Sequence, residues 1–343
     1  LRRTTTPKHF GSPVRLRLTN MEVSSLSREG YKSRANKTVW IFTIVYFGIT
    51  IAAFLCYWLA GMDSFDAINH AFSVVSTGGF STKDLSIATY NSAAINLITM
   101  FFMLIASIHF GLIFMVFATR SLKPLNNPVL KFYVLSIVIS ALLVSLSLKF
   151  QGTCFTWGQS LMTGFFHVIS AISTTGFAIS DNNTWPLFAC IITIIITIPC
   201  GMAGSTTGGI KADRMLLIFK TIGQQVKNVV HPSSINRLHI GNHILDKDEI
   251  YPHIVFMCLY FITIGASVAL TIMSGMDVQN AVATSISCLS NVGPGIESVG
   301  TFGNYNGLPV MAKITFILDM FLGRVEIYPI LAVAMMIFSG KNR

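Results

Sequence analysis

The composition of this 343-residue chain indicates a membrane protein and argues against a nucleic-acid-binding one. Apolar residues make up 52% of the chain and charged residues 11%, with a mean hydropathy of +0.64, a balance typical of membrane proteins. The net charge of +10 does not indicate a nucleic-acid partner. If the first segment is cytoplasmic and the chain crosses at each apolar run, most Lys and Arg residues fall on the cytoplasmic side.

Six apolar runs are long enough, or nearly so, to cross the roughly 20-residue hydrocarbon core of a bilayer. They cover residues 38–62, 85–119, 132–148, 182–210, 250–276 and 314–338. The first five contain no Asp, Glu, Lys or Arg, whereas the sixth is interrupted by Asp319, Arg324 and Glu326. We therefore expect an all-α, multi-pass membrane protein whose last span contains charged residues.

The chain divides into three repeated units and two cytoplasmic segments. Residues 1–37 are a basic cytoplasmic segment, and residues 221–250 are a polar cytoplasmic loop. The units occupy residues 38–120, 121–220 and 251–343, and each is predicted to contain a span, a short helix, a glycine turn and a second span. A repeat of one supersecondary unit indicates that one backbone shape is used three times.

The turn region of each unit carries the repeat most clearly. Its copies lie at residues 70–80, 167–177 and 284–294. A gapless alignment superimposes the glycines Gly79, Gly176 and Gly293. The helix before each turn, near 63–75 and 157–172 in the first two units, is too short to span a bilayer. Each such helix directs the negative end of its dipole toward the turn.

This layout is that of an ion-conducting pore loop. A dehydrated cation needs oxygen ligands, which rows of backbone carbonyls provide, and glycine allows the positive φ that turns carbonyls toward an axis. We therefore predict that a cation binds the residues Thr77, Gly78, Gly79, Thr174, Thr175, Gly176, Asn291, Val292 and Gly293. A re-entrant helix without conduction is the alternative reading.

A glycine-rich segment, residues 201–211, interrupts the second span of the middle unit. Irregular backbone at membrane depth is tolerated where it is buried in protein or lines a watery cavity, so we predict a gating loop beneath the turns. Its candidate residues are Gly201, Gly204, Ser205, Thr206, Thr207, Gly208, Gly209 and Lys211. One alternative, a phosphate loop, requires a lysine where Ile210 stands; the other is a simple turn that ends the span.

Arg324 is the most informative single residue of the sixth run. A guanidinium inside a span is costly and is expected to face a pore, a cavity or a partner acid. Glu326 and Asp319 are two and five residues away, so neither is well placed to pair with Arg324 along a helix. We predict that Arg324 belongs to the gate; a structural ion pair with another span is the alternative.

These motifs resemble the Trk/Ktr/HKT superfamily of potassium transporters, most of all its bacterial TrkH type. The resemblance rests on STGGF at 76–80, STTGF at 173–177, NVGPG at 291–295, GSTTGGIK at 204–211 and FLGRVEI at 321–327. It implies four units around a pseudo-fourfold pore, a filter glycine from each, an intramembrane gating loop matching 201–211 and a basic gate residue matching Arg324. It also implies K⁺ as the transported ion, homodimers in the bacterial inner membrane, and cytosolic nucleotide-binding regulatory subunits of the TrkA type.

The chain departs from that pattern because only three units are present. We expect the missing unit to precede Leu1 and the isolated piece not to conduct. A nonselective or sodium-preferring channel of the same architecture and a nonconducting membrane subunit remain alternatives. Symport with sodium or protons and uncoupled flow are both compatible with these residues. No nucleophile or acid–base pair suggests an enzyme, and no cofactor is expected in this chain.

Overall fold

The computed structural model is mostly helical. It describes residues 35–151, 156–231, 238–240, 243–245 and 247–339. The predicted basic segment at 1–37 lies almost entirely outside these residues, as does part of the predicted loop at 221–250.

The first unit contains a long helix, a short helix and a second apolar segment. Its elements are α2 (Ala35–Leu59), α3 (Ser64–Val75), the 3-10 turn η2 (Ser86–Tyr90), α4 (Ala93–Ser107), α5 (Phe110–Thr119) and the 3-10 turn η3 (Lys123–Leu125). The Asp63 side chain accepts a hydrogen bond from the Phe65 amide and so caps the start of α3. Ser92 caps α4 in the same way through the Ile95 amide.

The apolar run at 85–119 is not the single straight span that its composition predicts. The axes of α4 and α5 differ by 98°. Helix α4 ends because Ile108 adopts extended backbone, and the His109 ring accepts a hydrogen bond from the Gly111 amide at 2.8 Å, which starts α5 in a new direction. The isolated histidine in an apolar run therefore marks a break in the span.

The second unit contains two closely packed helices followed by a short helix and irregular chain. Its elements are α6 (Pro128–Phe150), α7 (Trp157–Ile172), the 3-10 turn η4 (Asn182–Thr184), α8 (Leu187–Ile196), β1 (Pro199–Cys200), β2 (Ile210–Lys211) and α9 (Ala212–Val230). Helix α8 has only 10 residues, so it does not cross a bilayer alone. Strands β1 and β2 pair in parallel, with Pro199 opposite Ile210, and close the glycine-rich loop at its base.

The third unit repeats the pattern after a small hairpin. Its elements are β3 (Leu238–Ile240), β4 (His243–Leu245), α10 (Lys247–Met273), α11 (Val278–Ser290), the 3-10 turn η5 (Glu297–Val299), α12 (Val310–Val325) and α13 (Ile327–Ser339). The run at 314–338 is divided at Glu326, whose φ of +65° ends α12. The boundary predicted at 220 falls inside α9, which continues to Val230.

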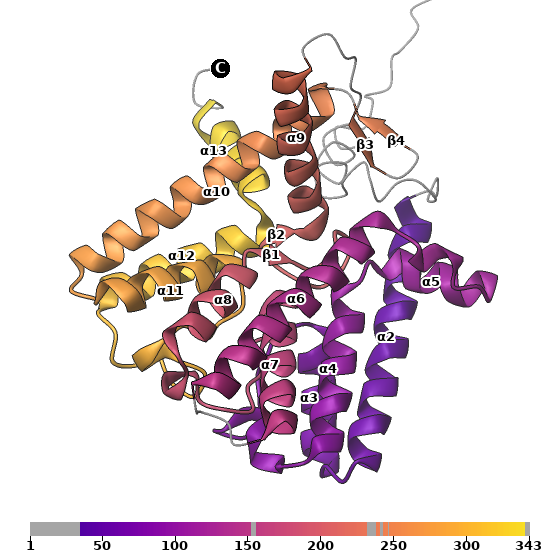
Figure 1. Ribbon diagram of the computed structural model, residues 1–343, viewed down its shortest axis with the longest axis vertical. Coiled ribbons are helices and arrows are strands. Elements are labelled where there is room, and N and C mark those ends of the chain that lie inside the picture. Colours follow the sequence, from indigo (N-terminus) through magenta and orange to yellow (C-terminus); the bar gives the residue numbers. More distant parts are fainter. Residues whose placement is uncertain (1–34, 152–155, 232–237, 241–242, 246, 340–343) are drawn as a thin grey trace, which may run out of the picture.

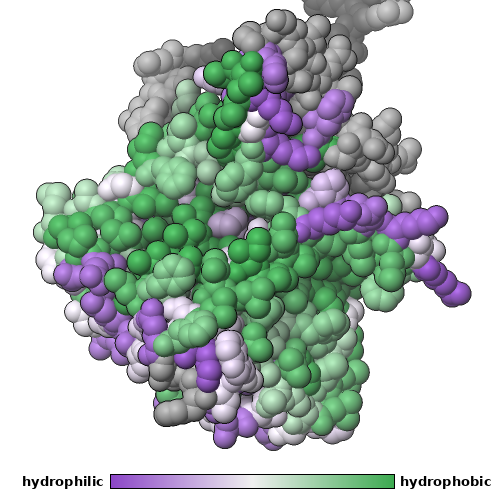
Figure 2. All heavy atoms as spheres, viewed as in Figure 1, coloured by the Kyte–Doolittle hydropathy of each residue, from purple (hydrophilic) through white to green (hydrophobic). Residues whose placement is uncertain are grey.

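The arrangement is that of a multi-pass membrane protein. Among the described residues, α2, α6 and α10 are each long and apolar enough to span a membrane, and α4 with α5 makes a fourth span if the bent pair is counted as one. Figure 2 shows hydrophobic residues over most of the visible face, with hydrophilic residues at its upper, right and lower-left edges. Figure 1 places β1 and β2 near the centre, between the side formed by α2 to α7 and that formed by α10 to α12.

Close packing of α6 against α7 depends on Gly164. A Cβ at this position would overlap the Ser145 hydroxyl and lie 3.0 Å from the Ser145 amide nitrogen. We expect Gly164→Ala to lower the free energy of unfolding by about 1–3 kcal/mol, as overpacking does, and to lower the melting temperature of the purified protein. Gly158→Ala on the same helix is the control, because no described residue lies within 4 Å of its Cβ position. Equal melting temperatures for the two variants would contradict this packing.

Candidate functional site

The three glycine turns share one backbone conformation. In each turn a polar residue at the C-terminal end of the short helix has a positive φ, and so does the glycine two positions later. The φ angles are +53° at Thr77 and +69° at Gly79, +54° at Thr174 and +84° at Gly176, and +61° at Asn291 and +102° at Gly293. Glycine adopts such angles at no steric cost, whereas threonine and asparagine do not. The strain is therefore repeated at equivalent positions.

The same hydrogen bond joins each turn to its short helix. It runs from the amide just before the repeated glycine back to a serine carbonyl in the last helical turn. The pairs are Gly78 to Ser73 at 2.8 Å, Thr175 to Ser170 at 3.0 Å, and Val292 to Ser287 at 3.0 Å. These bonds satisfy carbonyls at the helix C-terminus and leave the carbonyls of the turn itself for other partners.

The three turns lie directly against one another. A Cβ on Gly79 would overlap the Thr175 carbonyl oxygen, and a Cβ on Gly176 would overlap the Val292 carbonyl oxygen. The first turn therefore contacts the second and the second contacts the third, through the residues predicted to bind the ion. Main-chain oxygens of different units approach glycines that have no side chain to block them.

Histidines brace the first two turns from behind. The His70 Nε2 atom lies 2.9 Å from the Ser81 hydroxyl, and its Nδ1 atom lies 2.7 Å from the Asp66 carbonyl oxygen. His167 Nε2 lies 3.2 Å from the Ser180 hydroxyl. Both rings are buried, and each links a short helix to the chain that leaves its turn. Their role here is hydrogen bonding.

Most acidic residues near the short helices have structural partners. Asp63, Asp277 and Asp181 each accept a backbone amide hydrogen bond at the start of a helical segment. Asp66 is 6% exposed, and its carboxylate lies 3.1 Å from the Lys83 ammonium. These four carboxylates organise the short helices and the loops beside them.

The buried Asp66 carboxylate predicts acid sensitivity. A hydrogen bond donated by Thr82 at 2.6 Å lowers the pKa of Asp66 to about 2, below the usual value near 3.9. Because the folded-state pKa is depressed, ionised Asp66 stabilises the fold above pH ~4, and this contribution disappears as the pH falls toward 2. The difference in melting temperature between the original protein and Asp66→Asn should shrink across that window. Asp63→Asn, which keeps a capping side chain, should show no such trend; a constant Asp66 difference would refute the assignment.

The glycine-rich loop contacts the positive-φ polar residue of all three turns. The Thr77 hydroxyl donates to the Thr206 carbonyl oxygen at 3.0 Å, and the Gly208 amide donates to the Thr174 hydroxyl at 3.1 Å. A Cβ on Gly208 would lie only 2.7 Å from the Asn291 Cβ. The loop thus lies against the three turns together, and glycine at 208 is what permits the approach.

Charged side chains at the end of the loop and just after it hold the loop in place. Lys211 Nζ donates to the Thr207 carbonyl oxygen and lies 3.3 Å from the Thr207 hydroxyl. The Asp213 carboxylate, 2% exposed, accepts a 2.7 Å hydrogen bond from the Ala203 amide. Two charged residues thus fasten the loop to its own base.

The bend between α4 and α5 also holds the loop. The Met202 amide donates to the Ser107 carbonyl oxygen at 2.9 Å, and the Phe110 amide donates to the Gly204 carbonyl oxygen at 3.1 Å. Backbone groups that a continuous helix would have paired are satisfied by the loop instead, as membrane depth requires.

Arg324 reaches the loop from the last turn of α12. Its Nη1 atom donates to the Thr206 carbonyl oxygen at 2.7 Å, the same oxygen that accepts from Thr77. In the described ranges Arg324 makes no ion pair. The structure therefore brings Arg324 to the loop by a charged hydrogen bond to backbone, and the alternative of an ion pair with another span is not observed there.

The other two charges of the sixth run have separate partners. Asp319 is buried and accepts a hydrogen bond from the Ser267 hydroxyl of α10. Glu326, at the break between α12 and α13, forms a 2.6 Å ion pair with Arg214 in the first turn of α9. The Arg214 guanidinium also lies 4.2 Å from the centre of the Phe256 ring. These contacts join the end of the loop to the last span.

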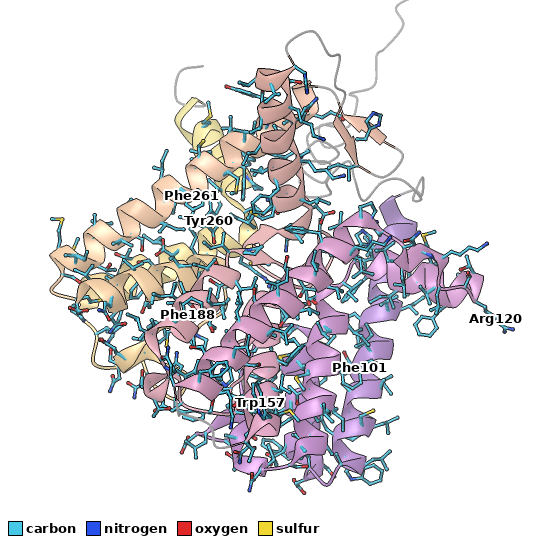
Figure 3. All side chains as sticks on the ribbon, viewed as in Figure 1. Phe101, Arg120, Trp157, Phe188, Tyr260 and Phe261 are labelled. Carbon is cyan, nitrogen blue, oxygen red and sulfur yellow. The ribbon has the colours of Figure 1, made fainter. Side chains whose placement is uncertain are left out.

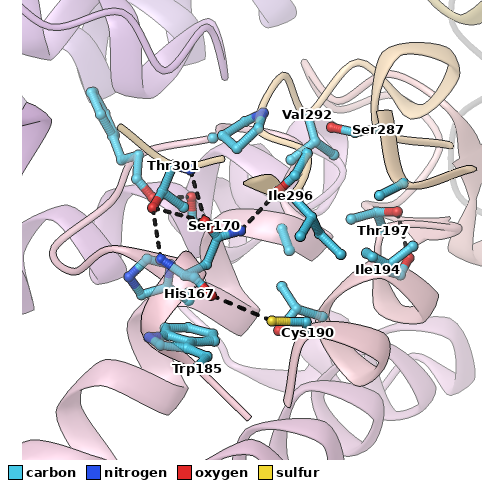
Figure 4. A pocket seen from close by; sticks show the side chains of 18 residues that line it. His167, Ser170, Trp185, Cys190, Ile194, Thr197, Ser287, Val292, Ile296 and Thr301 are labelled. Carbon is cyan, nitrogen blue, oxygen red and sulfur yellow. Dashed lines mark hydrogen bonds between the residues drawn. The ribbon is translucent and has the colours of Figure 1, made fainter. Parts of the chain in front are cut away.

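Cavities border this assembly. One, of about 40 Å³, lies behind the second and third turns and is lined by His167, Cys190 and Ser287 among others (Figure 4). It has room for water rather than a cofactor, and the buried Ser287 hydroxyl has no hydrogen-bond partner among the described residues. The second, of about 350 Å³ and more open, is bordered by Ser205 and Thr206 of the loop.

Some residues of the site were not predicted from the sequence. His109, Asp213 and Arg214 position the loop, and Tyr305 contacts the third turn. The sequence offered one signal for His109, Asp213 and Arg214: each is an ionisable residue within an apolar run or directly after one. Tyr305 lies in an irregular segment between η5 and α12, where no periodicity points to it.

Comparisons with known proteins agree with this architecture. The family model described as "TrkH: Cation transport protein" matches residues 13–343. The chain is 34% identical over 299 residues to the Trk system potassium uptake protein TrkH of Escherichia coli K12, and 31% identical over 309 residues to TrkG of the same strain. These alignments cover 86% and 89% of this chain and 60% and 61% of the relatives, so the chain spans about three fifths of their length.

A solved structure gives the same result for the fold. The crystal structure of the potassium transporter TrkH from Vibrio parahaemolyticus superimposes with a TM-score of 0.83 at 31% identity, covering 90% of this chain and 66% of that one. Sequence, family model and fold therefore agree, and the chain belongs to the TrkH family of cation transport proteins.

Proposed function

We propose that this chain supplies three units of a potassium pathway across the bacterial inner membrane. The observation that carries the proposal is the contact of three strained glycine turns with one another, Gly79 against the second turn and Gly176 against the third. Backbone carbonyls at such a junction replace the water of a bare alkali ion. The relatives named above are potassium uptake proteins, which favours K⁺ as the ion and a transporter over an enzyme.

The ion path would run through the nine residues of the three turns. Each short helix ends at its turn, so the negative ends of α3, α7 and α11 favour a cation at the junction. None of the nine turn residues is acidic, so these partial charges come from the helices alone. Carboxylates there would bind divalent ions more tightly than K⁺.

The glycine-rich loop would close this path, and Arg324 would hold it closed. The loop contacts all three turns through Thr206 and Gly208, so an ion leaving the turns meets it first. The cavity beside Ser205 and Thr206 provides space into which the loop can move. Opening would require the bond between Arg324 and Thr206 to break.

The proposed assembly is a homodimer whose gate responds to cytosolic nucleotide-binding subunits of the TrkA type. Helix α9 supports this route, because it starts at the end of the loop and leads away from it (Figure 1). A partner that moved α9 would act on the loop through Asp213 and on α12 through Arg214.

Rubidium uptake by the full-length gene product tests the proposal. In cells that lack their own potassium uptake, the protein should support uptake of radioactive rubidium that K⁺ inhibits more strongly than Na⁺ does. Equal inhibition by both ions would favour a nonselective channel, and stronger inhibition by Na⁺ a sodium-preferring one. Absence of uptake in membranes that contain the protein would favour a nonconducting subunit and refute the proposal.

A further inference from the structure

The third turn is held by a residue that lies outside the repeated turn region at 284–294. The Tyr305 hydroxyl donates a 2.6 Å hydrogen bond to the Gly293 carbonyl oxygen. The same hydroxyl lies 3.4 Å from the Cys288 sulfur of α11. The Tyr305 ring meets the Phe316 ring edge-on, with centroids 6.1 Å apart. Tyr305 is therefore held on two sides, by α11 and by α12, while it contacts the turn.

The described residues provide no equivalent brace at the first two turns. Among the described residues, no side chain donates a hydrogen bond to the carbonyl oxygen of Gly79 or Gly176. There the braces are His70 and His167, which bond to serines beyond the turn. The third unit has Thr284 at this position, and its hydroxyl bonds to Asn280 within its own helix. The third turn has thus lost the histidine brace and has a tyrosine instead.

The backbone at Gly293 also needs such a brace. Gly293 has a φ of +102° and no side chain, so its backbone has the wide conformational freedom of glycine. A hydrogen bond from a well-packed hydroxyl removes this freedom.

We propose that Tyr305 is a positioning residue that orients the Gly293 carbonyl and so contributes to the selectivity of the ion path. A carbonyl oxygen has two lone pairs, so Gly293 can accept from Tyr305 and still present a lone pair to an ion. Selection between K⁺ and the smaller Na⁺ depends on the number and field of the carbonyls around the ion. The inference rests on the proposed function and adds a residue to it.

The test compares two tyrosines that make the same bond. Tyr305→Phe removes the hydroxyl and keeps the ring. Tyr328→Phe is the matched control, because the Tyr328 hydroxyl also donates to a backbone carbonyl, that of Pro252, at 2.6 Å but between α13 and α10. The readout is the ratio of K⁺ to Na⁺ concentrations that inhibit rubidium uptake equally, measured on the full-length protein. This ratio does not depend on how much protein accumulates.

Tyr305→Phe should lower the preference for K⁺ about fivefold, the effect expected of one lost hydrogen bond, while Tyr328→Phe should keep the original ratio. An unchanged ratio in Tyr305→Phe, or an equal fall in both variants, would overturn the inference and leave the proposed function standing. Absence of uptake by the unmodified protein would refute both.

If Tyr305→Phe blocks uptake altogether, the inference is tested instead by the melting temperature of the purified protein in K⁺ and in Na⁺. Ions that bind the folded state raise this temperature, so K⁺ should stabilise the original protein more than Na⁺ does. Loss of that difference in Tyr305→Phe, with its retention in Tyr328→Phe, supports the inference. A retained difference in Tyr305→Phe overturns it.

Discussion

Replacing Arg324 with alanine is expected to raise potassium flux through the full-length protein by about tenfold or more. The Arg324 guanidinium donates a 2.7 Å hydrogen bond to the Thr206 carbonyl oxygen, which the loop also uses to contact the first turn. A hydrogen bond from a charged donor contributes about 1.5–3 kcal/mol. Its loss from the closed state alone would move the equilibrium between closed and open loops by at least a factor of about ten.

Two further variants make the Arg324 experiment specific. Arg324→Lys keeps the positive charge but replaces a planar, forked donor by a compact ammonium, so its flux should lie between those of the original protein and Arg324→Ala. Arg120→Ala is the control for loss of an arginine, because Arg120 projects from the far end of α5, away from the loop (Figure 3). Rubidium uptake per amount of membrane protein measures the effect. Unchanged uptake in Arg324→Ala would show that the bond is structural and that the gate lies elsewhere.

Replacing Gly176 with alanine is expected to reduce uptake to the level of cells without the protein. The added Cβ would overlap the Val292 carbonyl oxygen and lie 3.1 Å from Pro294, which forces the second and third turns apart. It would also place alanine at a φ of +84°. Both effects act on the carbonyls proposed to hold the ion.

Gly61→Ala separates the two effects. Gly61 has a similar φ of +97°, but in the part of the chain that the structure describes no atom lies within 4 Å of its Cβ position. Alanine there costs about 1–2 kcal/mol of backbone strain without touching the turns, so uptake should persist at a lower protein level. The measurement is rubidium uptake divided by the amount of protein in the membrane. If this quantity fell equally in Gly176→Ala and Gly61→Ala, backbone strain alone, and not the contact between turns, would explain the loss.

The repeated elements of this fold were predictable because they depend on local sequence. Asp63 before α3 and Thr156 before α7 are capping residues that mark helix starts. The repeated turn after α3, α7 and α11 was indicated by its glycine, which tolerates the positive φ found there. Long uncharged runs likewise predicted α2, α6 and α10 within a few residues.

The breaks in the spans and the contacts between units were not predictable in the same way. Hydropathy gives the length of an apolar run but not whether its helix is continuous, so the bend at His109 and the short α8 were missed. The bend depends on hydrogen bonds to the loop, which join Met202 to Ser107 and Phe110 to Gly204, residues far apart in sequence. Arg214 and Tyr305 were missed for the same reason, since only the folded chain places them beside Glu326 and Gly293.

The central claim, that main-chain oxygens of the glycine turns converge on one cation site, is tested most directly by locating the ion. Crystals of the full-length protein grown with rubidium in place of potassium would reveal it by anomalous scattering. We predict a peak at the junction of the turns, within reach of the carbonyls of Thr175 and Val292, which approach Gly79 and Gly176. Rubidium peaks elsewhere, with none at this junction, would contradict the account.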